Sequence, residues 1–86
     1  MRITYDIAKR DRTESERGLS FDDAVHVFAH VAMEIEDTRF AYGEPRFITF
    51  GYLEGRMVVV VWTPVEGGRR IISMRKANAR EQARYS

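Results

Sequence analysis

Three apolar stretches separated by short turns decide the fold of this chain: Arg46-Phe47-Ile48-Thr49-Phe50-Gly51-Tyr52-Leu53, Met57-Val58-Val59-Val60-Val61-Trp62-Thr63 and Arg69-Arg70-Ile71-Ile72-Ser73-Met74-Arg75-Lys76. All three are rich in β-branched and aromatic residues, which predicts strands. Glu54-Gly55 predicts a tight hairpin and residues 64–68 a second turn, so the strands form an antiparallel meander. The middle stretch lacks polar alternation, which predicts a central strand covered on both faces.

The residues before this meander predict a short strand and two helices. Residues 2–5 alternate apolar and polar side chains, as a strand does. Asp6 can accept hydrogen bonds from the first turn of a helix over residues 7–17, and Gly18 can end that helix. Ser20 is a natural cap for a second helix, in which apolar residues recur at helical spacing.

The remaining segments complete a small α+β domain. Residues 33–37 predict a strand and residues 38–45 a loop, while Asn78 and Glu81 form a capping box for a short helix. We therefore expect an antiparallel meander of four or five strands, two N-terminal helices packed on the sheet and a short C-terminal helix. A length of 86 residues suits a single domain, residues 1–86.

The composition narrows the possible classes of protein. The chain has no cysteine, which excludes a disulfide framework and thiolate chemistry. No apolar run approaches the roughly 18 residues that span a bilayer, and the N-terminus lacks an apolar signal core. We expect a soluble, cytoplasmic protein.

The net charge of +1 hides a strong asymmetry along the chain. Residues 19–45 carry one cation and six anions, whereas residues 69–86 carry six cations and one anion. The basic region is a strand with cations at both ends that leads almost directly into a helix, an arrangement that can hold phosphate. A solvated strand end, or a charged protein partner, would also account for it.

Five segments carry a pattern that extends over nearly the whole chain: Tyr5-Asp6-Ile7-Ala8-Lys9, Gly18-Leu19-Ser20-Phe21-Asp22-Asp23-Ala24, Glu44-Pro45-Arg46-Phe47, Val59-Val60-Val61-Trp62-Thr63 and Arg70-Ile71-Ile72-Ser73-Met74-Arg75-Lys76-Ala77. In order and spacing they resemble the BrnT toxin family. Its members typically read Trp-Asp-x-x-Lys, Lys-His-Gly-Val-Ser-Phe-Glu-Glu-Ala, Glu-x-Arg-Phe, Val-Val-Val-Tyr-Thr and Arg-Ile-Ile-Ser-Ala-Arg-Lys-Ala.

The resemblance implies a ribonuclease toxin of a type II toxin–antitoxin pair that inhibits translation, with a fold similar to RelE toxins. It implies a BrnA-like antitoxin as partner, RNA as substrate, and contact with operator DNA only through the antitoxin. A dimer, or a heterotetramer with the antitoxin, is compatible with it. Neither a cofactor nor a membrane is implied.

The sequence departs from the family pattern in its first third. The family tryptophan is Tyr5 here, and the family Lys-His pair reads Glu16-Arg17. If that histidine serves cleavage in relatives, this chain is a weak or inactive toxin-like module that binds an antitoxin or nucleic acid without cutting. A small basic DNA-binding protein is a third hypothesis, disfavoured because no helix combines a basic face with a helix-turn-helix pattern.

Metal-independent cleavage of RNA needs alignment, stabilisation of charge on the phosphate and proton transfer. Guanidinium and ammonium groups meet the second need. The candidate catalytic residues are Lys9, Arg46, Arg70 and Arg75. Without a suitably placed histidine, proton transfer falls to a lysine or to Glu44.

A second set of residues could bind the RNA chain: Tyr5, Glu44, Trp62, Ser73 and Lys76. Tyr5 and Trp62 could stack on bases, although packing in the sheet is the commoner role of such rings. Arg46 could equally form a surface pair with Glu44, and Lys9 could be a solvated lysine.

Strand geometry raises a difficulty for this site. Arg70 and Arg75 stand five residues apart, so a regular strand points them to opposite faces, unless the strand bends or Arg75 lies past its end. His26 and His30 have a spacing that can chelate zinc on a helix, but no third histidine exists. We expect no metal site.

Overall fold

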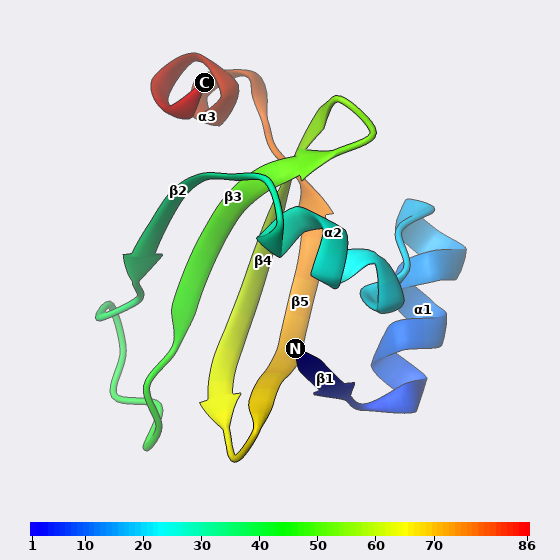
Figure 1. Ribbon diagram of the computed structural model, residues 1–86, viewed down its shortest axis with the longest axis vertical. Coiled ribbons are helices and arrows are strands. Elements are labelled where there is room, and N and C mark those ends of the chain that lie inside the picture. Colours follow the sequence, from blue (N-terminus) through cyan, green and yellow to red (C-terminus); the bar gives the residue numbers. More distant parts are fainter.

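A five-stranded sheet runs through the computed structural model, which spans residues 1–86 (Figure 1). The strands lie in the order β1-β5-β4-β3-β2, and their bounds are β1 Arg2–Tyr5, β2 Val31–Glu36, β3 Phe47–Leu53, β4 Arg56–Val65 and β5 Gly68–Lys76. The helices are α1 Ile7–Arg17, α2 Ala24–Phe28 and α3 Ala79–Tyr85, with a 3₁₀ turn at Phe21–Asp23 before α2. The expected α+β class is confirmed.

The sheet is mixed, so the prediction of a purely antiparallel meander is wrong for one strand. Strands β2 to β5 do form an antiparallel meander, and Glu54 and Gly55 make its tight turn with positive φ. Strand β1, however, pairs in parallel with β5, from Arg2 opposite Gly68 to Tyr5 opposite Ile71. Between β1 and β5 the chain forms α1, α2 and three strands, so no local pattern reveals this partner.

The second turn of the meander is shorter than expected. Only Glu66 and Gly67 form it, because Pro64 belongs to β4, opposite Arg69. Strand β3 reaches no further than Phe47, which faces Trp62. Beyond that point β4 has an open edge, where the missing N–H of a proline costs no ladder hydrogen bond.

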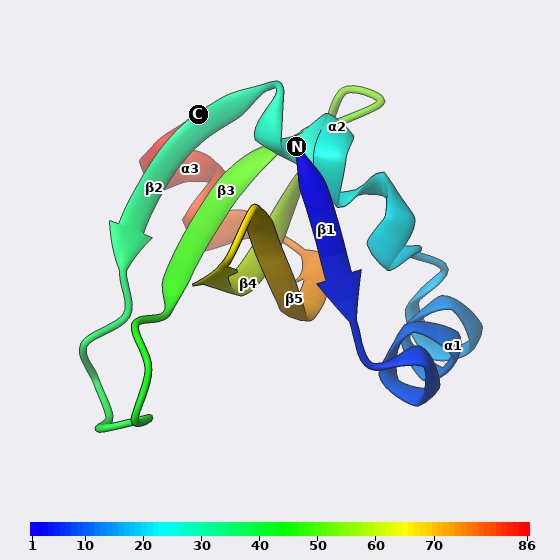
Figure 2. The same ribbon diagram turned by 60° about the horizontal axis from the view of Figure 1, so that its bottom comes forward.

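Strand β4 is buried on both faces, as its apolar run predicts. Val58, Val60 and Trp62 join a cluster under α2 and the 3₁₀ turn, while Met57 and Val59 join a smaller cluster on the other face. Side chains of the smaller cluster, including Phe50, pack against Tyr85 of α3, 4.3 Å between ring centroids. Figure 2 shows α2 and α3 on opposite sides of the sheet.

The two N-terminal helices are arranged differently from the expectation that both pack on the sheet. Only α2 does so, and it is short: the 3₁₀ turn replaces its first turn, and Ser20 accepts a hydrogen bond from the backbone N–H of Asp22. Helix α1 has the expected bounds and caps, Asp6 and Gly18, but lies beyond the β1–β5 edge (Figure 1) and buries no residue. Its apolar face is too small for a core helix, since Ile7 is exposed.

We expect Gly51→Ala to destabilise the protein by about 1–3 kcal/mol, because overpacking forces the backbone to shift. A Cβ at Gly51 of β3 would lie 2.5 Å from the carbonyl oxygen of Val27 and 2.9 Å from that of His30. Thermal unfolding measures the loss. In the control variant Gly43→Asn, the new side chain meets open space at a φ of +78°, which asparagine tolerates. Equal losses in both variants would contradict this account.

Candidate functional site

An open pocket of about 310 Å³ brings together charged residues from three separate parts of the chain. One wall is the start of α1, another is the loop before β3, and the floor is β5. The lining residues are Asp6, Lys9, Glu44, Arg46, Arg70, Ile71 and Ile72. Three of the four candidate catalytic residues, Lys9, Arg46 and Arg70, therefore line one pocket.

A β-bulge at Ile72 shapes the floor of this pocket. Ile71 faces Trp62 of β4, but Ser73 already faces the adjacent residue Val61, so Ile72 is an extra residue without a partner. On the far side of the bulge Arg75 pairs with Val59, and on the near side Arg70 pairs with Thr63. Residues that pair across a ladder share a face of the sheet.

The bulge therefore corrects the expected distribution of cations on β5. Val59, Val61 and Thr63 alternate along β4 and lie on one face, so their partners Arg75, Ser73 and Arg70 lie on that face too. The expectation that Arg70 and Arg75 point to opposite faces is wrong, because it assumes a regular strand. Arg69 and Lys76, opposite Pro64 and Val58, lie on the α2 face.

A chain of contacts positions Arg46 at the pocket. Its guanidinium lies over the ring of Tyr42, 4.0 Å from the centroid, and its Nε is 3.3 Å from Oε2 of Glu44. The Tyr42 hydroxyl in turn donates to Oδ2 of Asp37 at 3.0 Å. A cation over an aromatic face is attracted by the ring quadrupole, so Tyr42 and Glu44 together restrain the guanidinium.

The buried carboxylate of Asp37 anchors the loop between β2 and β3. Arg39 donates to it from Nε and Nη2, at 2.8 and 2.9 Å, and also from its backbone N–H. These hydrogen bonds lower the pKa of Asp37 far below its usual value, although burial opposes the shift. Asp37 stays ionised, and the loop that carries Tyr42, Glu44 and Arg46 stays fixed at its base.

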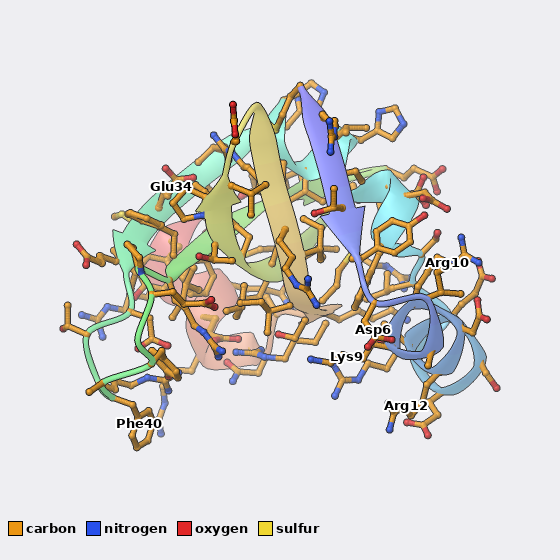
Figure 3. The ribbon with its side chains drawn as sticks, turned by 90° about the horizontal axis from the view of Figure 1, so that it is seen from below. Asp6, Lys9, Arg10, Arg12, Glu34 and Phe40 are labelled. Carbon is orange, nitrogen blue, oxygen red and sulfur yellow. The ribbon has the colours of Figure 1, made fainter.

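Lys9 and Arg70 enter the pocket without an ion-pair partner. Neither takes part in a salt bridge, and both residues are exposed. Asp6 lies beside Lys9 at the start of α1 (Figure 3), where its carboxylate accepts hydrogen bonds from the backbone N–H groups of Ala8 and Lys9. Free cations next to an engaged carboxylate are available to an anionic ligand.

Arg75 lies outside this pocket and is held by α3. It donates two hydrogen bonds of 2.8 Å to Glu81, from Nη1 and Nη2. They lower the pKa of Glu81 to about 2, against the opposing effect of burial. Glu81 also completes the predicted capping box with Asn78, so the pair fastens α3 to the end of β5.

The candidate RNA-binding residues are scattered. Glu44 lines the pocket, Ser73 lines a neighbouring pocket together with Lys9, and Lys76 lines a third pocket on the α2 face. Trp62 is buried and donates from Nε1 to Thr49 at 2.8 Å, so its ring offers no free face to a base. Tyr5 packs edge-to-face on Phe21, and its hydroxyl donates to Asp22.

Sequence reasoning missed Arg12, which lines the neighbouring pocket beside Lys9. The signal was available, since residues three apart on a helix share a face. The expectation that His26 and His30 lie on one helix is wrong. Helix α2 ends at Phe28, so only His26 belongs to it. No group of three or more potential ligand side chains is arranged around a metal position.

The comparisons with known proteins identify the family. Residues 5–81 match the family model described as "Ribonuclease toxin, BrnT, of type II toxin-antitoxin system". The chain belongs to the BrnT family. The match covers all the elements from the start of α1 to the start of α3, and with them every residue that lines the pocket.

Membership of the BrnT family supplies the general activity. The chain is a ribonuclease toxin of a type II toxin–antitoxin system, and an antitoxin is its partner. A search of curated protein sequences finds no match. None of the helices combines the length and apolar character that crossing a membrane requires.

We expect the stability contributed by the Arg75–Glu81 pair to disappear in acid. Because the pKa of Glu81 falls from 4.5 to about 2 on folding, the pair stabilises the protein above about pH 4.5 and loses this effect as the pH falls toward 2. Glu81→Gln keeps a side chain suited to the capping box but removes the charge. Urea unfolding between these pH values should show that the free energy of unfolding of the unmodified protein exceeds that of Glu81→Gln at pH 4.5, and that this difference vanishes as the pH falls toward 2. A difference that does not change with pH would contradict this role of the pair.

Proposed function

We propose that the pocket between α1, β5 and the loop before β3 binds the scissile phosphate of single-stranded RNA and promotes its cleavage without a metal. The observation that carries this proposal is the convergence of Lys9, Arg46 and Arg70 on one pocket from three chain segments. Negative charge grows on the phosphorane oxygens when the 2′-oxygen of the RNA attacks the phosphate. Fixed cations stabilise that charge more than they stabilise the ground state.

Glu44 is the proposed acceptor of the 2′-hydroxyl proton. It is the carboxylate of the pocket that is not occupied in capping a helix, and its pairing with Arg46 holds it beside a cation of the same pocket. Lys9 then stabilises the charge on the phosphate or protonates the leaving 5′-oxygen. Arg75 has a positioning role in this scheme, since its guanidinium is already bound to Glu81.

The proposal extends to the partner and the cellular effect of the protein. We propose a BrnA-like antitoxin that covers the pocket, contact with operator DNA only through that antitoxin, inhibition of translation in the cytoplasm, and a core similar to RelE toxins. We also propose a dimer or a heterotetramer with the antitoxin, because the antitoxin would then lie over the basic pocket of this small domain. Co-purification with the product of a neighbouring gene tests the choice of partner.

One observation favours a second candidate, a toxin-like module that binds without cutting. Arg17 stands where the family pattern has histidine, and its Nη1 donates to the carbonyl oxygen of Met74 at 3.0 Å. A guanidinium keeps its proton at physiological pH, so it cannot act as the general base that an imidazole can be. The two candidates differ only in whether Glu44 and Lys9 suffice for proton transfer.

We expect the purified protein to cleave single-stranded RNA in the presence of EDTA. Lys9→Ala and Arg70→Ala should each lower the cleavage rate by about 10²-fold, the usual cost of removing one group that stabilises transition-state charge. The control is Arg80→Ala, which removes the same charge from an exposed position on α3.

Three outcomes decide between the candidates. Cleavage in EDTA that depends on Lys9 and Arg70 supports the nuclease. RNA binding without cleavage, lost in Arg70→Ala, supports the binding module. Full cleavage by both variants would overturn the assignment of the pocket.

We expect Tyr42→Ala to lower the cleavage rate by about two- to thirtyfold, since a cation–π contact is worth roughly 0.5–2 kcal/mol. The substitution removes the ring beneath Arg46. Tyr42→Phe keeps the ring and loses only the hydrogen bond to Asp37, so it should retain most of the activity. Single-turnover cleavage rates at saturating protein compare the two variants. Equal rates in both would show that the ring does not position Arg46.

A further inference from the structure

A second pocket, of about 350 Å³, directly adjoins the first. The two share Lys9 and Ile72, so they lie side by side along β5, and we refer to them together as the groove. The second pocket is lined by Lys9, Arg12, Thr13, Glu16, Arg17, Ile72 and Ser73. Both volumes lie at the lower end of the range of about 300–1,000 Å³ that is typical of ligand pockets.

The spacing of residues on α1 explains why this groove is basic. Positions 9, 12, 13 and 16 follow the i, i+3, i+4, i+7 pattern and share one face of the helix, the face toward β5. Lys9 and Arg12 extend from the same side of α1 in Figure 3, whereas Arg10 points away and donates to the Tyr5 hydroxyl.

The opposite wall is a strand edge that no other strand covers. Strand β1 pairs with β5 only as far as Ile71, so the edge from Ile72 onward has no partner on that side. The bulge leaves Ile72 unpaired toward β4 as well. Arg17 closes the far end by donating to the carbonyl oxygen of Met74, which fixes the last turn of α1 against β5.

The chemistry of the second pocket suits a phosphate and not a base. Three cations and one carboxylate line it, and Arg12 takes part in no salt bridge. Thr13 and Ser73 add hydroxyl donors. No aromatic ring lines the pocket, and base recognition in single strands relies on such rings.

We propose that this second pocket binds the phosphate next to the scissile one, so that the groove holds two consecutive phosphates of a single-stranded RNA and Lys9 lies between them. The inference rests on the proposed function, which assigns the scissile phosphate to the first pocket. Binding at the second pocket should not depend on base sequence, because its lining offers cations and hydroxyl groups but no aromatic ring on which a base could stack.

The test uses 2′-O-methyl RNA oligonucleotides, which cannot be cleaved because the attacking hydroxyl is blocked. Fluorescence anisotropy of the intact protein gives the affinity for a dinucleotide, with one phosphate, and for a tetranucleotide, at several salt concentrations. We expect Arg12→Ala to weaken tetranucleotide binding about tenfold, the effect of one charge-assisted hydrogen bond, and to leave dinucleotide binding within about twofold. The slope of log affinity against log salt for the tetranucleotide should fall by about 0.7.

Two control variants distinguish the effect of the position of Arg12 from the effect of the total charge of the protein. Arg12→Lys keeps the positive charge and should recover most of the affinity for the tetranucleotide. Arg80→Ala removes one charge from α3 and should change neither affinity nor slope. Alanine is the best helix former, so Arg12→Ala does not threaten the folding of α1.

The outcomes distinguish this inference from the proposed function. If Arg12→Ala leaves the affinity for both oligonucleotides unchanged, or lowers both affinities equally, the second pocket is not a phosphate site. This conclusion holds whatever the cleavage assay shows. If Arg12→Ala lowers the affinity for the tetranucleotide alone but Arg70→Ala still cleaves RNA at the full rate, the second pocket is a phosphate site. The assignment of the scissile phosphate to the first pocket is then wrong.

Discussion

Strand β4 stays buried only while both of its faces are covered, and the site opens where this cover ends. The α2 face is closed by α2 and the 3₁₀ turn, and the other face by α3 over Phe50 and Met57. Helix α3 covers only part of that second face. The groove opens beside the part it leaves uncovered, between the start of α1 and the loop before β3 (Figure 3). The fold therefore leaves one region of its sheet free for a charged ligand.

The bulge at Ile72 connects this packing to the proposed chemistry. Without it, Arg70 and Ser73 would stand three residues apart on a regular strand and point to opposite faces of the sheet. With it, both lie on the same open face. The bulge also coincides with the end of β1, which exposes the edge of β5 beside α1. One extra residue thus places Arg70 on the face that Ser73 and Arg75 share, and it lies where the edge of β5 becomes free.

Local patterns predicted most of the fold, because they depend on neighbouring residues. The caps of α1, the hairpin at Glu54-Gly55 and the capping box of α3 are all of this kind. The parallel pairing of β1 and the bulge were not predictable: the first joins segments more than sixty residues apart, and Ile71-Ile72-Ser73 reads like any regular strand. For the site, residue type singled out Lys9, Arg46 and Arg70. That Glu81 would engage Arg75 depends on how the chain turns after β5, which no spacing rule supplies.

Helix α1 buries none of its residues, and this has a consequence for how the groove behaves in solution. The helix is fastened by polar contacts at its two ends, among them the bond from Arg17 to the Met74 carbonyl. Such an element opens at a lower free energy than the sheet, so its amide protons exchange with solvent earlier. A polyanion that bridges α1 and β5 would slow that exchange, so binding itself would stabilise the arrangement of the two walls that the ligand contacts.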